Sequence, residues 1–124
     1  MTQLESITLL ENQELALDYL RRVLLAPVYD VAIETELTSL TKLSSRLGNQ
    51  ILLKREDQQP VHSFKLRGAY NKLANLSEAE CIHGVIAASA GNHAQGLALA
   101  AHKLSISATI VMPITTPDIK VDNV

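Results

Sequence analysis

Two apolar runs that flank one amphipathic stretch constrain most strongly what this chain can fold into. The first run, from Gly84 to Ala88, is uninterrupted, as expected of a strand that is covered on both faces. The second, from Ile106 to Met112, predicts another buried strand. Between them, residues 92–103 predict a helix whose inward positions are Ala94, Leu97, Ala98 and Ala101. This order predicts two parallel strands joined by a right-handed crossover.

The preceding part of the chain predicts three helices and one short strand. A helix from Gln13 to Ala26 is stopped by Pro27, and a shorter helix that contains Leu40, Leu43 and Leu47 is closed by Gly48 and Asn49. Residues 51–54 predict a strand. We expect Ser63 to cap the next helix. The apolar stripes are Ala16, Leu20, Val23 and Leu24 in the first helix, and Leu66, Ala69, Tyr70 and Leu73 in the last.

The order of these elements predicts an α/β fold with a parallel sheet flanked by helices. We expect a helical N-terminal arm over residues 1–49 and a partial α/β unit over residues 50–124. A helix start is also predicted at Thr115–Asp118, with Pro117 at the first helical position. Because the sequence stops two turns later, we interpret the chain as part of a longer protein.

Composition excludes several classes of protein. The 124 residues amount to one domain, and 47% hydrophobic against 19% charged residues is typical of a chain with a core. A net charge of −2 without a basic block argues against nucleic acid or an anionic membrane as a partner. The single cysteine, Cys81, excludes an intramolecular disulfide and favours a cytoplasmic setting. We find no signal peptide and no apolar run of transmembrane length.

One lysine stands in a special position. In the run KREDQQPVHSFKLRGA, Lys65 falls in the opening turn of a predicted helix, directly after Phe64. The partial positive charge of a helix N-terminus disfavours a protonated amine, and partial desolvation, which we also expect, acts the same way. Lys65 is therefore a candidate Schiff-base nucleophile. The alternatives are a solvated helix lysine and, for Phe64, a core aromatic residue.

A second motif, SAGNHAQG from Ser89 to Gly96, lies where a predicted strand passes into a predicted helix. Ligands of open α/β sheets bind at this carboxyl end of the strands. Gly91 permits a tight turn, and the amides at the helix start can hold an anion without a charged side chain. The alternative is a plain turn with Asn92 as the N-cap. We interpret His93 as a hydrogen-bonding residue rather than a general base.

The remaining titratable residues predict structure rather than chemistry. Residues 54–57, with the sequence KRED, could form a catalytic cluster, but we interpret them as a salt-bridged strand end that fixes the loop before Lys65. Arg67 is expected to have the same structural role. The histidines His62, His83 and His102 show no ligand spacing with one another or with Cys81, so we expect no metal site.

Together the two motifs resemble the active-site signatures of the tryptophan-synthase-β-like family of pyridoxal-phosphate enzymes, which have fold type II. The resemblance covers nearly the whole chain, and the family uses the string S-F-K-x-R-G-A around its cofactor-linking lysine. Within the family, the residues Val61 and His62 before this string are most similar to the biosynthetic threonine dehydratases. The departure is Glu36, where the family has proline between a threonine and a leucine; it affects a local turn.

The resemblance implies a role for each matching residue. Lys65 would be the catalytic residue and would link pyridoxal 5'-phosphate, Phe64 would lie against the cofactor ring, and Asn92 would bond the 3-hydroxyl of the cofactor. The residues that would bind the carboxylate of the amino-acid substrate are Ser89, Gly91, Asn92 and His93. The implied activity is conversion of L-threonine to 2-oxobutanoate and ammonia, for isoleucine synthesis, by a cytoplasmic homo-oligomer.

Two alternatives stay open. A sister enzyme of the same fold would act on serine or racemise it, and a non-catalytic truncated product would serve only as an association module. The family holds the cofactor phosphate with a glycine-rich loop, whereas the five glycines of this chain are scattered. We also expect most of the second domain, and the regulatory domain, of such enzymes to lie outside the given sequence. We therefore expect the chain alone to hold the cofactor weakly and to have little or no activity.

Overall fold

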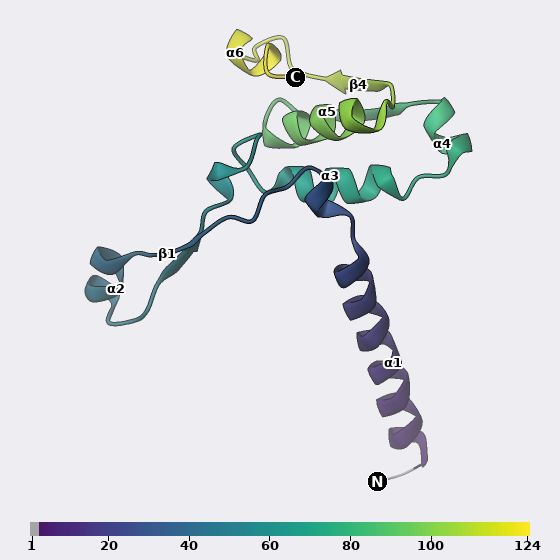
Figure 1. Ribbon diagram of the computed structural model, residues 1–124, viewed down its shortest axis with the longest axis vertical. Coiled ribbons are helices and arrows are strands. Elements are labelled where there is room, and N and C mark those ends of the chain that lie inside the picture. Colours follow the sequence, from purple (N-terminus) through teal and green to yellow (C-terminus); the bar gives the residue numbers. More distant parts are fainter. Residues whose placement is uncertain (1–2) are drawn as a thin grey trace.

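The computed structural model describes the backbone of residues 3–124 and the side chains from Gln13 onward, and its centre is a pair of packed helices (Figure 1). Helix α3 (Lys65–Ala74) lies against α5 (Asn92–Leu104), and α5 in turn lies beside a small sheet. The hydrophobic core gathers where these elements meet and consists of Ala69, Tyr70, Leu73, Leu97, Ala100 and Ala101. The predicted α/β class with a parallel sheet is confirmed.

The predicted stripes of α3 and α5 form this core. All four predicted inward residues of α3 are buried, and Leu66 is fully enclosed. In α5, Ala94, Leu97 and Ala101 are buried as expected, Ala98 is half-buried, and Ala100 joins them. The buried Tyr70 hydroxyl donates a hydrogen bond of 2.9 Å to the Asp30 carboxylate, which raises the pKa of Tyr70. This bond ties α3 to the short helix η1 (Val28–Asp30).

The two helices touch through their backbones at one point. A Cβ atom placed on Gly96 would lie 3.0 Å from both the carbonyl carbon of Lys65 and the amide nitrogen of Leu66. Real Cβ atoms rarely come so close to other atoms. The absence of a side chain at Gly96 therefore allows α5 to approach the first turn of α3.

The pairing of the strands differs from the prediction in one of the two sheets. Strands β3 (Val85–Ala88) and β4 (Ala108–Val111) pair in parallel, with Val85 opposite Ala108, as predicted. The strand expected at residues 51–54 exists as β2 (Leu52–Lys54), but it pairs antiparallel with β1 (Leu37–Ser39), which was not predicted. Its assignment to the parallel sheet was therefore wrong. Because β1 and β2 pair across residue 50, the division of the chain there stays a proposal.

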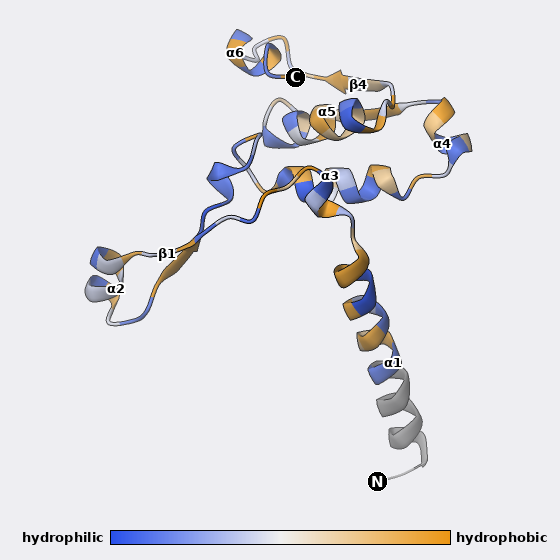
Figure 2. Cartoon of the chain, in the orientation of Figure 1, coloured by the Kyte–Doolittle hydropathy of each residue, from blue (hydrophilic) through white to orange (hydrophobic). Residues whose placement is uncertain are grey.

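The prediction that the parallel strands are covered on both faces was also wrong. Val85 and Ala87 face the helices, whereas Ile86 is 73% exposed and Val111 is half exposed. In the described residues, the helices cover one face of this sheet. The apolar stripe of α1 (Gln3–Leu25) is exposed too, and Figure 2 shows it as orange segments on a helix that projects away from the core.

The shorter elements follow their capping signals. Helix α2 (Thr41–Leu47) ends as predicted at Gly48, which has a left-handed backbone with φ of 58°. Helix α4 (Glu78–Ile82) was missed, although Ser77 and Glu80 form a reciprocal capping box. Helix α6 (Asp118–Val121) begins one residue later than predicted, with Pro117 at its cap. Helix α3 is the exception: its N-cap is Phe64, so the prediction that Ser63 caps it was wrong, and the Ser63 hydroxyl only accepts a long hydrogen bond of 3.4 Å from the Lys65 backbone N–H.

Replacing Tyr70 with phenylalanine tests the contribution of the tyrosine to the core. We expect Tyr70→Phe to lower the free energy of unfolding by about 1 kcal/mol, because the ring stays buried while its hydrogen bond to Asp30 is lost. Urea unfolding followed by far-ultraviolet circular dichroism measures this. Tyr19→Phe on the exposed face of α1 is the matched control and should change stability by less than about 0.5 kcal/mol. Equal stability of the two variants would contradict the assignment.

Candidate functional site

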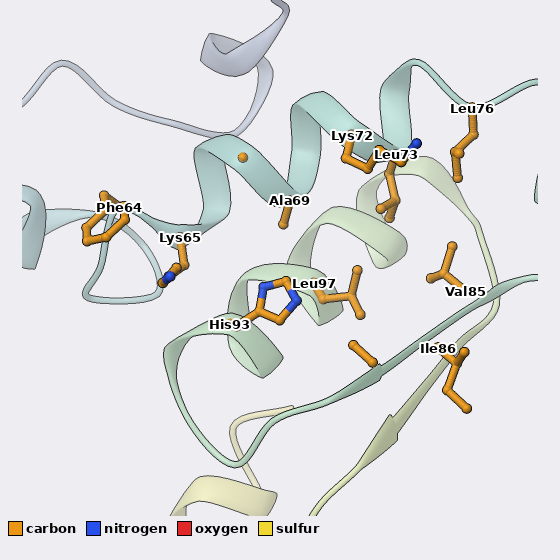
Figure 3. Close-up of a pocket in the computed structure, with 12 residues that line it drawn as sticks. Phe64, Lys65, Ala69, Lys72, Leu73, Leu76, Val85, Ile86, His93 and Leu97 are labelled. Carbon is orange, nitrogen blue, oxygen red and sulfur yellow. The ribbon is translucent and has the colours of Figure 1, made fainter.

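A pocket of about 560 Å³ lies between α3, β3 and the start of α5 (Figure 3). Both motifs contribute a polar side chain, Lys65 from the start of α3 and His93 from the first turn of α5, and Lys72 adds a second amine from further along α3. The rest of the lining is mainly apolar and consists of Phe64, Gly68, Ala69, Lys72, Leu73, Leu76, Val85, Ile86, Ala87 and Leu97. An apolar pocket of this size with a few convergent polar groups is typical of a small-molecule site.

Lys65 is exposed at this pocket, and its Nζ atom lies 5.2 Å from the centroid of the Phe64 ring. The expectation that the amine is partly desolvated was therefore wrong for this structure. The alternative that Phe64 is a core aromatic residue is excluded as well, because the ring is 58% exposed. An exposed amine beside an exposed aromatic ring leaves both groups available to a ligand that enters the pocket.

The loop from Ser89 to Gly91 joins β3 to α5, as predicted. The Ser89 backbone N–H donates to the Val111 carbonyl over 3.0 Å, and the Ser89 hydroxyl accepts from the Gly91 N–H over 3.3 Å. Gly91 is the cap of α5, so Asn92 is the first helical residue and not the N-cap. The first amides of a helix have no acceptor within it. Those of Asn92 and His93 can therefore bind an anion, and the partial positive charge of the helix end favours one.

The structure brings some of the predicted site residues together and leaves others nearby. Lys65, Phe64 and His93 line the same pocket. The other three predicted residues, Ser89, Gly91 and Asn92, do not line it but lie in the four residues that lead into His93. The assignment of each residue to cofactor or substrate stays a prediction. Within residues 13–124, no three His, Cys, Asp or Glu side chains gather in the way that a metal site requires.

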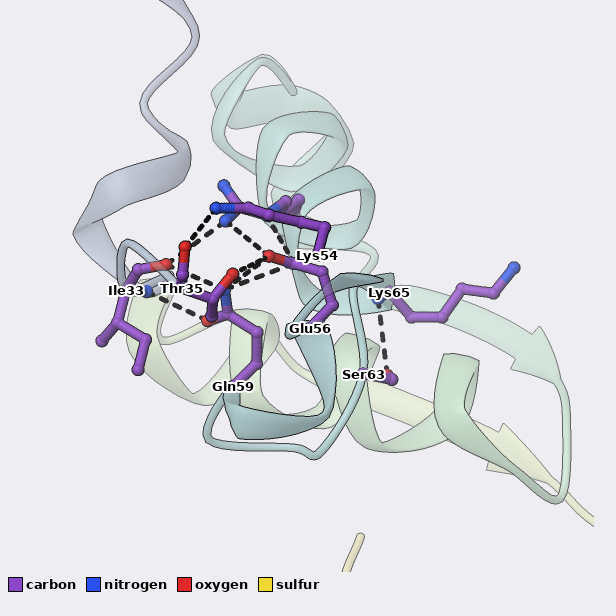
Figure 4. Close-up of polar contacts among 8 residues, drawn as sticks. Ile33, Thr35, Lys54, Glu56, Gln59, Ser63 and Lys65 are labelled. Atoms are coloured by element: carbon purple, nitrogen blue, oxygen red, sulfur yellow. Dashed lines mark hydrogen bonds and ion pairs between the residues drawn. The ribbon is translucent and has the colours of Figure 1, made fainter. Parts of the chain in front are cut away.

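A polar network lies next to the start of α3, and the Lys65 side chain points away from it (Figure 4). Arg67 donates to both Glu56 carboxylate oxygens over 2.8 and 3.1 Å, and the Thr35 hydroxyl donates to the same carboxylate over 2.7 Å. Gln59, 1% exposed, accepts from the Ile33 backbone N–H and donates to the Ile33 carbonyl. The network therefore ties the segment 33–35 to the start of α3.

The structural interpretation of the charged residues before Lys65 is confirmed. Arg55 pairs with Asp57 over 2.7 Å, Arg67 pairs with Glu56, and the Lys54 amine donates to the Thr35 carbonyl. Sequence reasoning missed Gln59 and Thr35, which are buried and form hydrogen bonds to partners 26 and 21 residues away. No local pattern in the sequence marks either residue.

Comparison with known proteins identifies the class to which this site belongs. The family described as pyridoxal-phosphate dependent enzymes matches residues 28–124, and the chain belongs to this family. The predicted family and its cofactor, pyridoxal phosphate, are thereby confirmed.

Within the family, several of the similar proteins are biosynthetic threonine dehydratases. The chain is 63% identical to L-threonine dehydratase biosynthetic IlvA of Escherichia coli (strain K12) over 107 residues, which cover 86% of this chain and 21% of that protein. It is 61% identical to threonine dehydratase 2 biosynthetic, chloroplastic, of Solanum lycopersicum, over 86% of this chain and 18% of that protein. The chain thus spans about a fifth of the length of the curated relatives it matches.

Two solved structures show the same fold. The processed form of threonine deaminase isoform 2 from Solanum lycopersicum matches with a TM-score of 0.80 and 60% identity, over 86% of this chain and 30% of that one. Maize serine racemase matches with a TM-score of 0.74 and 36% identity, over 79% of this chain and 30% of that one.

The residues of the pocket fit one end of pyridoxal phosphate. The exposed Lys65 amine can react with an aldehyde, and the exposed Phe64 ring and apolar wall suit a planar aromatic ring. The N-terminus of α5 offers free amides to a hydroxyl or an anion. The fit is therefore good for the aldehyde and the ring. The glycines of the described residues are scattered along the chain and form no glycine-rich loop for the phosphate of the cofactor.

The polar network makes stability depend on pH. The Arg67 guanidinium, helped by the Thr35 hydroxyl and the Gln59 amide, lowers the pKa of Glu56 from its usual 4.5 to about 2. A carboxyl with a lower pKa in the folded state stabilises the fold above pH 4.5 and loses this contribution as the pH falls toward 2.

We therefore expect the free energy of unfolding of the wild-type chain to fall as the pH is lowered from 4.5 toward 2. For Glu56→Gln we expect a smaller fall, because the variant lacks the titrating carboxyl group. The measurement is urea unfolding at several pH values between neutral and acid. Asp57→Asn is the control, since the Asp57 pKa is also lowered, by its exposed pair with Arg55. Parallel curves for wild type and Glu56→Gln would contradict the expectation.

Proposed function

We propose that the chain is the N-terminal part of a pyridoxal-phosphate-dependent threonine ammonia-lyase, which converts L-threonine to 2-oxobutanoate and ammonia for isoleucine synthesis. The observation that carries the proposal is the meeting of Lys65, Phe64 and His93 in one pocket beside the N-terminus of α5. Identity of 63% to the L-threonine dehydratase of Escherichia coli supports the choice of threonine.

Each predicted site residue has a role in this proposal. Lys65 would link the cofactor through its aldehyde carbon, and Phe64 and Asn92 would contact the ring and its hydroxyl. The bound cofactor supplies an electron sink for the charge that develops at the α-carbon of the substrate. The Lys65 amine, released when the substrate amine takes its place, would remove the α-proton as a general base. The β-hydroxyl would then leave as water, and hydrolysis of the resulting enamine by a water molecule would give 2-oxobutanoate and ammonia.

The loop residues would orient the substrate. Ser89, Gly91, Asn92 and His93 would bind its carboxylate, using the free amides at the start of α5 and the adjacent polar side chains. A carboxylate held there limits rotation of the substrate, so that its Cα–H bond faces the lysine. This restriction lowers the entropic part of the barrier.

Serine racemase or a serine and threonine dehydratase of the same fold is the second candidate. The match to maize serine racemase, at 36% identity, favours it less than the matches near 60% to threonine enzymes. An association module without activity is the third candidate, and the share of 21% of the relative's length favours it for the chain alone.

A cytoplasmic, homo-oligomeric complete enzyme forms part of the proposal. The single cysteine of the chain supports the location. Among the residues that the structure describes, no helix has both the length and the apolar character needed to cross a membrane. The exposed apolar stripe of α1 supports association with further protein surface.

Reductive trapping tests the role of Lys65. The chain is incubated with pyridoxal phosphate, reduced with borohydride and digested, and mass spectrometry locates the modified lysine. We expect preferential modification of Lys65, because its amine is exposed beside an aromatic ring and an apolar pocket. Lys65→Ala should remove this signal, whereas Lys42→Ala, an exposed lysine on α2, should leave it unchanged. Equal labelling of all lysines would overturn the proposed role.

Product analysis tests the substrate. A polypeptide that carries this chain together with the remaining length of its relatives should form 2-oxobutanoate from L-threonine faster than pyruvate from L-serine, and should form no D-serine. The ratio of kcat/KM for the two substrates is the measurement. A higher kcat/KM for serine, or racemisation, would select the second candidate.

A further inference from the structure

We propose that Gly96 is a positioning residue for Lys65, because its missing side chain lets α5 touch the peptide bond that follows the lysine. This inference rests on the proposed role of Lys65 as the cofactor-linking residue. Gly96 does not line the pocket, and it has no side chain that could contact Lys65 or His93. Its effect is therefore transmitted through the backbone of α3.

The contact involves atoms that cannot move aside independently. A Cβ atom on Gly96 would lie 3.0 Å from the Lys65 carbonyl carbon, 3.0 Å from the Leu66 nitrogen and 3.2 Å from the Leu66 Cα. All three belong to the backbone, so rotation of a side chain cannot relieve the contact. Leu66 is itself fully buried. Any side chain at Gly96 must therefore push α3 and α5 apart.

Helix propensity gives no reason for a glycine at this position. Gly96 lies inside α5, and its φ is not in the left-handed region, so an alanine could adopt the same backbone. Glycine in a helix interior costs about 1 kcal/mol relative to alanine. Gly68 in α3 and Gly91 in the loop show the contrast, since a Cβ on either would meet nothing within 4 Å. The close approach therefore explains Gly96.

The contact sets the spacing of the two motifs. Lys65 is the first residue of α3, and His93 lies three residues before Gly96, on the same side of α5. Both side chains line the pocket. Because the peptide bond after Lys65 rests on Gly96, the distance between the lysine backbone and the first turn of α5 is fixed there. Productive geometry at such a site tolerates a displacement of about 0.5 Å, and about 1 Å can lower reactivity by about a hundredfold.

The test compares two variants that add bulk to the same helix interface. Gly96→Ala adds a methyl group at the contact with Lys65, and Ala100→Val adds bulk one turn further along α5, at a fully buried position outside the pocket. Each chain is trapped with pyridoxal phosphate and borohydride. The readout is labelling of Lys65 relative to the four lysines of the same molecule that do not line the pocket, Lys42, Lys54, Lys103 and Lys120.

We expect Gly96→Ala to lower this ratio about tenfold per folded molecule, with Ala100→Val close to wild type although it also loses stability. Circular dichroism gives the folded fraction, and trimethylamine N-oxide restores it where a variant is partly unfolded. A ratio that returns to the wild-type value once Gly96→Ala is refolded would overturn the proposal. So would a variant that the osmolyte cannot refold, because the contact would then serve the fold alone.

Failure of the two proposals can be told apart. If wild type shows no preference for Lys65, the proposed function is wrong at this lysine and the inference about Gly96 falls with it. If wild type shows the preference and Gly96→Ala keeps it, the proposed function stands and the positioning role is wrong.

Discussion

The packing of α3 on α5 is the contact on which the rest of the structure depends. It buries the core residues of both helices, and it brings the starts of the two helices together at the same end. One start carries Lys65 and the other follows the loop from Ser89 to Gly91. The pocket is thus a product of how the two helices pack, and the core that holds the chain together also assembles its reactive groups.

A second layer of order comes from the polar network before α3. Gln59 uses both ends of its amide on the backbone of Ile33, as a neighbouring strand would, and Glu56 gathers Arg67 and Thr35 around one carboxylate. Buried amides and carboxylates are tolerated only when their hydrogen bonds are satisfied. The network therefore restrains the loop before Lys65, while the apolar pocket lies on the other side of the lysine.

The helices of the core were predictable because their apolar residues recur at helical spacing, as Leu66, Ala69, Tyr70 and Leu73 do. Lys65, Phe64 and His93 could also be located from the sequence, because the motif that marks each of them lies within a few neighbouring residues. The pairing of β1 with β2 was not predictable, since strands of three residues carry no period. Gln59 and the contact at Gly96 depend on partners distant in sequence, which only the folded chain reveals.

The two-stranded parallel sheet has a consequence for handling the chain. In the described residues, β3 pairs only with β4, so the outer edge of each strand presents N–H and C=O groups to solvent, next to the exposed Ile86 and Val111. Such edges are templates for pairing between molecules. Self-association through them competes with correct folding and rises with concentration, so dilute solutions favour the monomer that carries an accessible pocket.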